Sequence, residues 1–207
     1  MSHSNAPEML TALLRERRSI RKFRPDPIAR DVIQAVIDDV RFMPCPTNRA
    51  CFRFLLVEDH LKLEAMRQEI ITEVEATAAG LAPEDAETFR AYADYFTFFT
   101  KAPATLVGLY RTFVSRLPSG GPGSDSIQGL SEIQAFGGAV GALLLSLEAR
   151  GIGSCWMSGP LIAERRITRI LEVEEPWHLG AIIPLGYAEE RPACPKKPDL
   201  ERVFSVC

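Results

Sequence analysis

Apolar positions follow two different spacings along the chain, which predicts helices separated by short strands. Arg30–Met43 carries its apolar residues at intervals of three and four, as an amphipathic helix does, and Pro44 ends the pattern. Phe52–Val57 is instead a compact run of aromatic and branched residues, which is typical of a strand. The same reasoning predicts further helices at Glu8–Arg17, His60–Ala79, Pro83–Thr100, Gln128–Arg150 and Leu161–Leu171, and strands at Ala104–Tyr110, Ser154–Met157 and Leu179–Tyr187.

The order of these elements indicates the fold class. Strands separated by helices favour a sheet that is covered by helices on both faces. Neither an internal repeat nor a linker divides the sequence, so residues 1–207 are predicted to form a single α+β domain. The segment Leu117–Ile127 is rich in glycine and proline and is predicted to be a flexible loop. The proline-rich tail Glu189–Val206 lacks apolar periodicity and is expected to lie across another surface.

Composition excludes several classes of protein. The chain has 207 residues, 46% of them hydrophobic, and a net charge of only −3, which suits one domain with a sizeable core. That balance argues against disorder and against nucleic acid as a partner. The longest apolar run, Ala135–Leu145, is far shorter than the roughly 20 residues of a membrane helix. Met1–Pro7 lacks the apolar core of a secretion signal, so no membrane partner is expected.

Cysteine usage favours a reducing compartment. Five cysteines make an odd count, none forms a C-x-x-C pair, and the three histidines lie far apart. Neither a disulfide framework nor a metal site fits this spacing. Free thiols are typical of the cytoplasm, which is the predicted location. The cysteines are Cys45, Cys51, Cys155, Cys194 and Cys207.

Positive charge is concentrated near the amino end. Six cations and one acid occupy Arg15–Arg24, whereas the remainder of the chain is acidic. If the chain leaves the first helix in an extended form, Ser19 and Arg21 point the same way. A hydroxyl and a guanidinium on one side can hold a phosphate through charge-assisted hydrogen bonds. Alternatively, these cations complement the carboxyl end of the first helix and stay in solvent.

Three other segments are candidates for ligand contact, each with a simpler alternative. Asn48 follows a proline turn and could present its amide to a planar ligand, or could satisfy its own backbone. The glycines of Gly137–Gly141 and Gly151–Gly159 permit close approach of a ligand or of a neighbouring helix. Lys196 could bind an anion or sit in a solvated turn. The sequence contains no P-loop and no G-x-S-x-G elbow, and His178 lacks an obvious nucleophilic partner.

The order of these segments resembles that of the nitroreductase family. Arg17–Pro25 is similar to its R-R-S-x-R-x-F-x-P opening, and Pro44–Phe54 to its P-S-x-x-N-x-Q-P-W-x-F loop. Gly151–Trp156 resembles G-L-G-T-C-W, and Ile183–Tyr187 with the Lys196-Lys197-Pro198 tail resembles the P-L-G-Y strand and basic tail. The chain departs from the family pattern at Cys45, at Ala50-Cys51 and at Cys194.

The resemblance implies a structure and a set of site residues. It implies a three-layer fold with a mixed central sheet flanked by helices, in a domain-exchanged homodimer that holds FMN between its subunits. The tail 189–207 would pack on the partner subunit. No catalytic side chain and no metal are implied, since the flavin carries the chemistry. The residues implied to contact the flavin are Arg17, Arg18, Ser19, Arg21 and Lys196 at the phosphate and ribityl end, Cys45 and Asn48, often from the partner, and Trp156, Met157, Ser158 and Gly159 along the ring.

The implied function is electron transfer from NADH or NADPH to a small-molecule acceptor such as a nitroaromatic or a quinone, by a ping-pong mechanism. Enone reduction or reductive dehalogenation on the same fold is an alternative. So are a non-enzymatic flavin-binding protein and a small nucleic-acid module. The aromatic stretch Tyr92–Phe99 and the loop Leu117–Ile127 are candidates for the walls of the substrate pocket. For the aromatic residues, packing in the core is the other interpretation.

Overall fold

The structure is a computed structural model that describes residues 5–113 and 129–207. The predicted loop Leu117–Ile127 lies outside the described residues.

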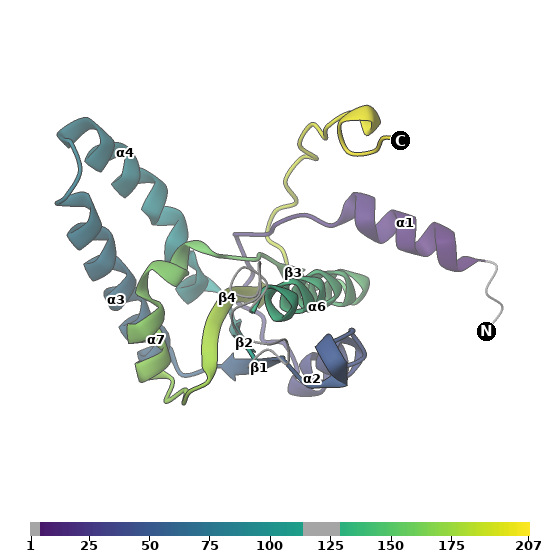
Figure 1. Cartoon of the computed structure of the whole chain (residues 1–207), viewed down its shortest axis with the longest axis horizontal. Helices are drawn as coiled ribbons and strands as arrows, with labels where there is room; N and C mark the ends of the chain where they lie inside the picture. The colour runs from purple at the N-terminus through teal and green to yellow at the C-terminus, as the bar shows by residue number, and fades with distance from the viewer. Residues whose placement is uncertain (1–4, 114–128) are drawn as a thin grey trace.

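A four-stranded sheet forms the centre of the molecule (Figure 1). Its order is β1 (Phe52–Val57), β2 (Ala104–Arg111), β4 (Trp177–Gly186) and β3 (Gly153–Ser154). All the named strand pairs are antiparallel, and one parallel bridge joins Ser19 to Ser154. The two inner strands are nearly continuous apolar runs, as expected for strands that are buried on both faces.

Helices cover both faces of the sheet. Alternate residues of a strand point to opposite faces, so Leu106 joins the core under α2 (Arg30–Val40) and α6 (Leu130–Ala149). Val107 points the other way, into a core closed by three further helices. These are α3 (His60–Ala78), α4 (Pro83–Ala93) and α7 (Glu164–Ile170). The predicted α+β class is confirmed, with two helical layers around one sheet (Figure 1).

Helix α6 is the central helix of the site. Among the described residues it is the one helix long and apolar enough to cross a membrane by length and composition. In this fold its apolar residues face the sheet and α2, and Phe136, Leu143 and Leu147 are buried there. A core helix of the fold therefore accounts for its hydropathy.

Several element boundaries differ from the sequence-based prediction. Strand β1 has the predicted limits, but Pro83–Thr100 is not one helix: α4 ends at Ala93, and two 3-10 turns, Asp94–Phe96 and Phe98–Lys101, follow. Thr97, with φ −121° and ψ −5°, interrupts the helical backbone between them. A 3-10 turn (Gly159–Ala163) likewise precedes α7.

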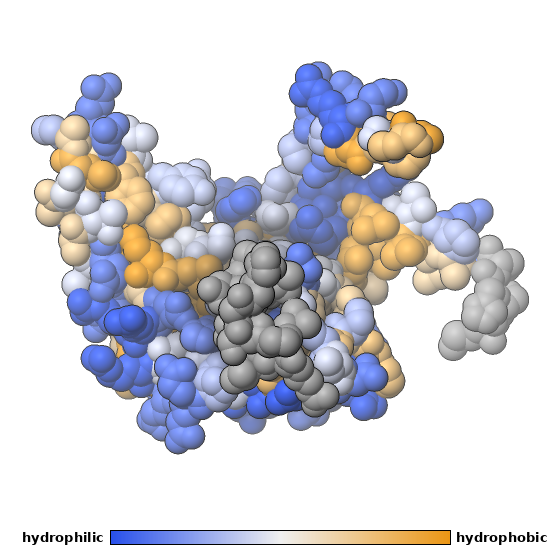
Figure 2. All heavy atoms as spheres, viewed as in Figure 1, coloured by the Kyte–Doolittle hydropathy of each residue, from blue (hydrophilic) through white to orange (hydrophobic). Residues whose placement is uncertain are grey.

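Helix α1 (Ala6–Glu16) and the carboxyl-terminal tail extend away from the body of the molecule (Figure 1). No residue of α1 is buried, and Met9, Leu10 and Leu14 are more than half exposed. The tail contains one 3-10 turn (Leu200–Arg202) and exposes Phe204. Figure 2 shows apolar surface on both segments. A single chain thus leaves a large apolar surface uncovered.

Candidate functional site

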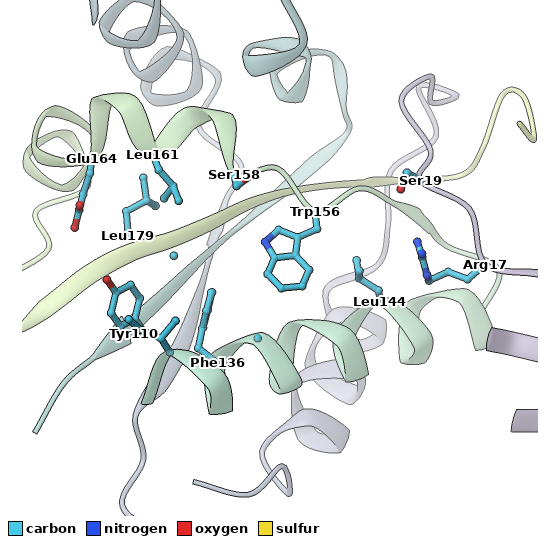
Figure 3. A pocket seen from close by; sticks show the side chains of 13 residues that line it. Arg17, Ser19, Tyr110, Phe136, Leu144, Trp156, Ser158, Leu161, Glu164 and Leu179 are labelled. Carbon is cyan, nitrogen blue, oxygen red and sulfur yellow. The ribbon is translucent and has the colours of Figure 1, made fainter. Parts of the chain in front are cut away.

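A cavity of about 700 Å³ opens beside α6, which is a typical size for a small-molecule site. It is bounded by α6, by β4 and by the segment that follows β3 (Figure 3). Polar side chains lie at its two ends, and apolar ones form its middle. The cavity is therefore an elongated apolar slot whose ends differ in chemistry.

Arg17 and Ser19 lie at one end of this cavity (Figure 3). Arg17 leaves the helical conformation at the end of α1, with φ −52° and ψ 132°. The following chain runs beside β3, where the Ile20 amide donates to the Ser154 carbonyl at 3.0 Å. A side chain at Gly153 would overlap Ile20, so glycine there permits this close approach. The hydrogen bond of Ile20 and the glycine at position 153 thereby hold in place the backbone segment that carries Arg17 and Ser19.

Arg17 is the cation that lines this end of the cavity, and it has no carboxylate partner among the described residues. Within residues 5–113 and 129–207, no ion pair involves its guanidinium, which is only partly exposed. A guanidinium that is partly buried and has no carboxylate partner is suited to binding an external anion. Two neighbouring cations are solvated instead. Lys22 pairs with Glu190 and Arg24 pairs with Asp26, and both ion pairs are exposed.

Arg18 and Arg21 are placed differently from Arg17. The Arg18 guanidinium turns back and donates to the carbonyls of Arg15 and Arg17, at 2.6 and 2.9 Å. It thus complements the carboxyl end of α1. Arg21 lines a second cavity, of about 390 Å³, on the other side of Trp156. The cationic cluster is therefore divided between a helix end and two cavities.

Trp156 borders both cavities, and the residues after it line the second one. The Met157 amide donates to the Ile182 carbonyl at 2.9 Å, which anchors this segment to β4. At Gly159 a side chain would overlap the ring of buried Phe96. The predicted residues Trp156, Met157, Ser158 and Gly159 all line the second cavity, together with Arg21. Trp156 and Ser158 line the large one as well.

The aromatic residues after α4 divide between the two roles expected for them. Phe99 is buried in the core, and Phe96 is buried and also borders the second cavity. Tyr92 and Tyr95 are exposed and line the second cavity. The aromatic segment therefore contributes both to the hydrophobic core and to the wall of the second cavity.

The far end of the large cavity carries a polar cluster that the sequence did not reveal. Glu164 Oε1 lies 3.3 Å from His178 Nδ1, and the rings of His178 and Tyr110 are 5.3 Å apart. Burial, and secondarily the carboxylate of Glu164, raise the pKa of the Tyr110 phenol. Strand register brings these residues together, because Tyr110 on β2 pairs with His178 on β4. In the sequence, the hint of this cluster is the position of Glu164 in the first turn of the predicted helix Leu161–Leu171.

Three predicted site residues lie away from both cavities of the single chain. Asn48 ends a 3-10 turn, Pro46–Asn48, Cys45 directly precedes that turn, and Lys196 is exposed on the tail. None of the three lines the cavities described above. Asn48 has φ 54°, a backbone conformation that asparagine tolerates better than most residues. Across the described part of the chain, no cluster of acidic, histidine and cysteine residues could hold a metal ion.

Comparison with known proteins defines the family. The model of the nitroreductase family matches residues 14–187. The chain belongs to this family. It is 28% identical over 198 residues to the 5,6-dimethylbenzimidazole synthase of Rhodospirillum rubrum, covering 94% of this chain and 87% of that protein.

Two solved structures show the same fold. A BluB-like flavoprotein from Clostridium difficile 630 superposes with a TM-score of 0.83 at 23% identity, covering 96% of this chain and 98% of that one. The FMN-dependent nitroreductase NfnB from Mycobacterium smegmatis, solved with NADPH, gives a TM-score of 0.72 at 17% identity, with 98% and 99% coverage. The predicted nitroreductase-like fold is thereby confirmed.

Proposed function

We propose that this protein is an FMN-dependent oxidoreductase that passes electrons from NADH or NADPH to a small acceptor, such as a nitroaromatic or a quinone, by a ping-pong mechanism. Family membership supports oxidoreductase chemistry, and the similar NfnB structure is of an FMN-dependent enzyme with NADPH. The observation that carries the proposal is the elongated cavity with Arg17 and Ser19 at one end. FMN has the matching form, a dianionic phosphate joined to a flat ring.

The side chains of the chain fit such a ligand. The unpaired charge of Arg17 and the hydroxyl of Ser19 would hold the phosphate, each through charge-assisted hydrogen bonds. Phe136, Leu144 and Trp156 form apolar walls that would exclude water from a planar ring. Phe136 can lie flat on the sheet because Gly108 and Gly180 beneath it have no side chains. When bound, FMN accepts a hydride from the nicotinamide and delivers electrons to the acceptor.

The acceptor would then occupy the slot that the nicotinamide leaves. In this assignment, Arg21 lines the second cavity near Trp156 and would favour negative charge developing on the reduced flavin. Glu164 at the far end would orient any donor group of an acceptor. No side chain has to act as a dedicated acid or base.

The proposal includes a homodimer of one-domain subunits, each spanning residues 1–207. The exposed apolar residues of α1 and the tail support it, because a second chain would cover them. The tail 189–207 would then pack on the partner. Cys45 and Asn48 would reach the flavin from the partner subunit, and Arg18 and Lys196 would join Arg17 and Ser19 at its phosphate. The free thiols support a cytoplasmic location.

The test is a visible spectrum followed by kinetics. Purified protein should show the flavin absorbance bands, lose them on addition of NADH or NADPH, and recover them when a nitroarene is added. Steady-state rates at several fixed acceptor concentrations should give parallel double-reciprocal lines. Intersecting lines would exclude a single shared slot, and a colourless preparation that does not take up FMN would exclude the flavin itself.

The similarity to a 5,6-dimethylbenzimidazole synthase favours a second candidate, a flavin enzyme of this fold with different chemistry. Enone reduction and reductive dehalogenation belong to this candidate. A screen of nitroarenes, quinones, enones and halogenated phenols with each nicotinamide would distinguish the two. Bound flavin without turnover of any acceptor would instead indicate a flavin-binding protein that is not an enzyme.

A further inference from the structure

Two cysteine sulfurs meet across a tight turn at the edge of the sheet. Cys51 Sγ lies 3.3 Å from Cys45 Sγ, although the two residues are six positions apart in sequence. The turn between them is closed by two backbone hydrogen bonds, from Asn48 N to the Cys45 carbonyl at 3.1 Å and from Arg49 N to the Pro46 carbonyl at 3.2 Å. Prolines on both sides of Cys45 restrict its backbone further. The contact between the sulfurs is therefore built into the fold of the turn.

The two thiols differ in accessibility, and the buried one holds its proton. Cys51 is fully buried directly before β1, and its carbonyl accepts from the Arg111 amide at 2.9 Å. Burial, and then its hydrogen bond to Cys45, raise the pKa of the Cys51 thiol to about 12. Cys51 therefore keeps its proton at neutral pH and donates it to the Cys45 sulfur. Cys45 is partly exposed and is the sulfur that a small oxidant can reach.

We infer that Cys45 and Cys51 form a redox-active dithiol site, which hydrogen peroxide oxidises to a disulfide across the turn. The contact between the sulfurs lies within one chain and is independent of the flavin assignment, although the proposed dimer also brings Cys45 close to the flavin. No other pair among the five cysteines, all of them in described segments, has its sulfurs in contact: Cys155 is buried elsewhere, and Cys194 and Cys207 are exposed on the tail.

The chemistry balances in two steps. The Cys45 thiolate attacks one peroxide oxygen, so that an S–O bond forms and the O–O bond breaks; the released hydroxide takes up a proton and becomes water. The Cys51 sulfur then attacks the Cys45 sulfur, the S–S bond forms and the S–O bond breaks. The proton of Cys51 passes to the departing hydroxide, which leaves as a second water. Two thiols are oxidised and one peroxide is reduced.

The arrangement favours the disulfide over further oxidation of Cys45. A disulfide requires the sulfurs to approach to about 2.05 Å, a short movement from contact distance that rotation of the side chains can supply. Because the Cys51 sulfur already lies in contact with Cys45, it can attack the sulfenic acid within the same turn, giving up its proton as the S–S bond forms. Closure would tie Cys45 to the start of β1 and restrain the turn that carries Asn48.

The sequence between the cysteines allows a direct test. Trypsin cleaves after Arg41, Arg49 and Arg53, so the two cysteines fall on separate peptides, 42–49 and 50–53. The full-length protein, as purified with its flavin, is treated with hydrogen peroxide, alkylated, digested without reductant and analysed by mass spectrometry. We expect the two peptides joined with the loss of two hydrogens, a free-thiol count lower by two, and reversal of both by dithiothreitol.

Variants separate this site from the exposed thiols. The matched background is Cys194→Ser with Cys207→Ser, in which the linked peptides should still form. Adding Cys45→Ser should abolish the link and leave the Cys51 thiol unmodified under the same treatment. The inference is overturned if Cys45 accumulates as sulfinic acid beside an intact Cys51 thiol. It is equally overturned if the wild-type peptides link only to Cys194 or Cys207, or not at all.

Discussion

Glu164 lies at the end of the large cavity opposite Arg17 (Figure 3), and its Oε1 is 3.3 Å from Nδ1 of His178. The slot therefore has a cationic end and an end with a carboxylate. If the cationic end holds a phosphate, the carboxylate is left to interact with whatever enters beside the ring. An acceptor that carries an ammonium group or another strong donor would be favoured there.

Replacing Glu164 by Gln tests this role of the carboxylate. The change keeps the size of the side chain and removes its charge. The KM for a quinone that bears an ammonium group should rise roughly 3- to 10-fold, corresponding to about 1 kcal/mol of lost charge pairing, while the KM for its neutral analogue stays within a factor of two. Glu84→Gln, on exposed α4, is the control. Equal changes in KM for both quinones would show that the charge of Glu164 does not determine specificity.

Arg17→Ala and Ser19→Ala test the anion end. Each contact to a phosphate contributes about 1–3 kcal/mol, so each variant should weaken FMN binding roughly 5- to 150-fold. Fluorescence of released flavin during dialysis measures the effect. Lys62→Ala, which removes a partly exposed cation from α3, should retain FMN as the wild type does. Undiminished flavin in both site variants would place the phosphate elsewhere.

Local patterns predicted most of the fold, because helix and strand periodicity is written in neighbouring residues. The limits of β1 follow from one apolar run, and α2 from one stripe. The break at Thr97 was not predictable, since the aromatic residues around it continue a helical pattern while the core on this side binds Phe96 and Phe99 in separate turns. Tertiary packing decided the backbone there.

The site was predictable only where its residues are close in sequence. Arg17 and Ser19 share one segment, and their common cavity follows from that segment leaving α1 in an extended form. Tyr110, Glu164 and His178 come from three elements: the pairing of β2 with β4 places Tyr110 beside His178, and the packing of α7 against β4 brings Glu164 to them. Charge alone could not distinguish Arg17 from Arg18 either. The Arg18 guanidinium donates to two backbone carbonyls at the end of α1, whereas Arg17 lines the large cavity.

Gly159→Ala should destabilise the protein. The added methyl group would overlap the Phe96 ring, which is buried and cannot move without disturbing the core around α3. Such overpacking costs about 1–3 kcal/mol, measured as a lower free energy of unfolding in urea. Gly80→Ala is the matched change, since its methyl group would meet nothing closer than the Thr77 carbonyl at 3.5 Å. A loss in Gly80→Ala as large as that in Gly159→Ala would contradict the packing explanation.

Acid should loosen the contact between α2 and α6. The Ser146 hydroxyl donates to Asp39 at 2.7 Å, and this bond, helped by the charge of Arg150, holds the pKa of Asp39 below its ordinary value of 3.8. A carboxyl group whose pKa is lowered by folding stabilises the folded state above its unfolded pKa, and this contribution is lost as the pH falls through the folded pKa. An NMR titration of the Asp39 carboxyl carbon should show the low pKa in the wild type and a higher one in Ser146→Ala. Ser205→Ala, on the exposed tail, should leave the Asp39 titration as it is in the wild type.

Leu14→Glu tests whether the exposed face of α1 is the subunit interface. Leu14 is 59% exposed in the single chain, so a charge there costs little in a monomer but would be buried in a dimer. Light scattering after size exclusion should show a dimer for the wild type and a monomer for Leu14→Glu. The monomer should also lose FMN, since Asn48 and Lys196 would no longer reach the partner's cavity. Leu61→Glu, at the exposed start of α3 and away from α1, is the control and should remain dimeric with bound flavin. If Leu14→Glu stays dimeric and yellow, the interface lies on another face and the two-subunit flavin site has to be rebuilt from different residues.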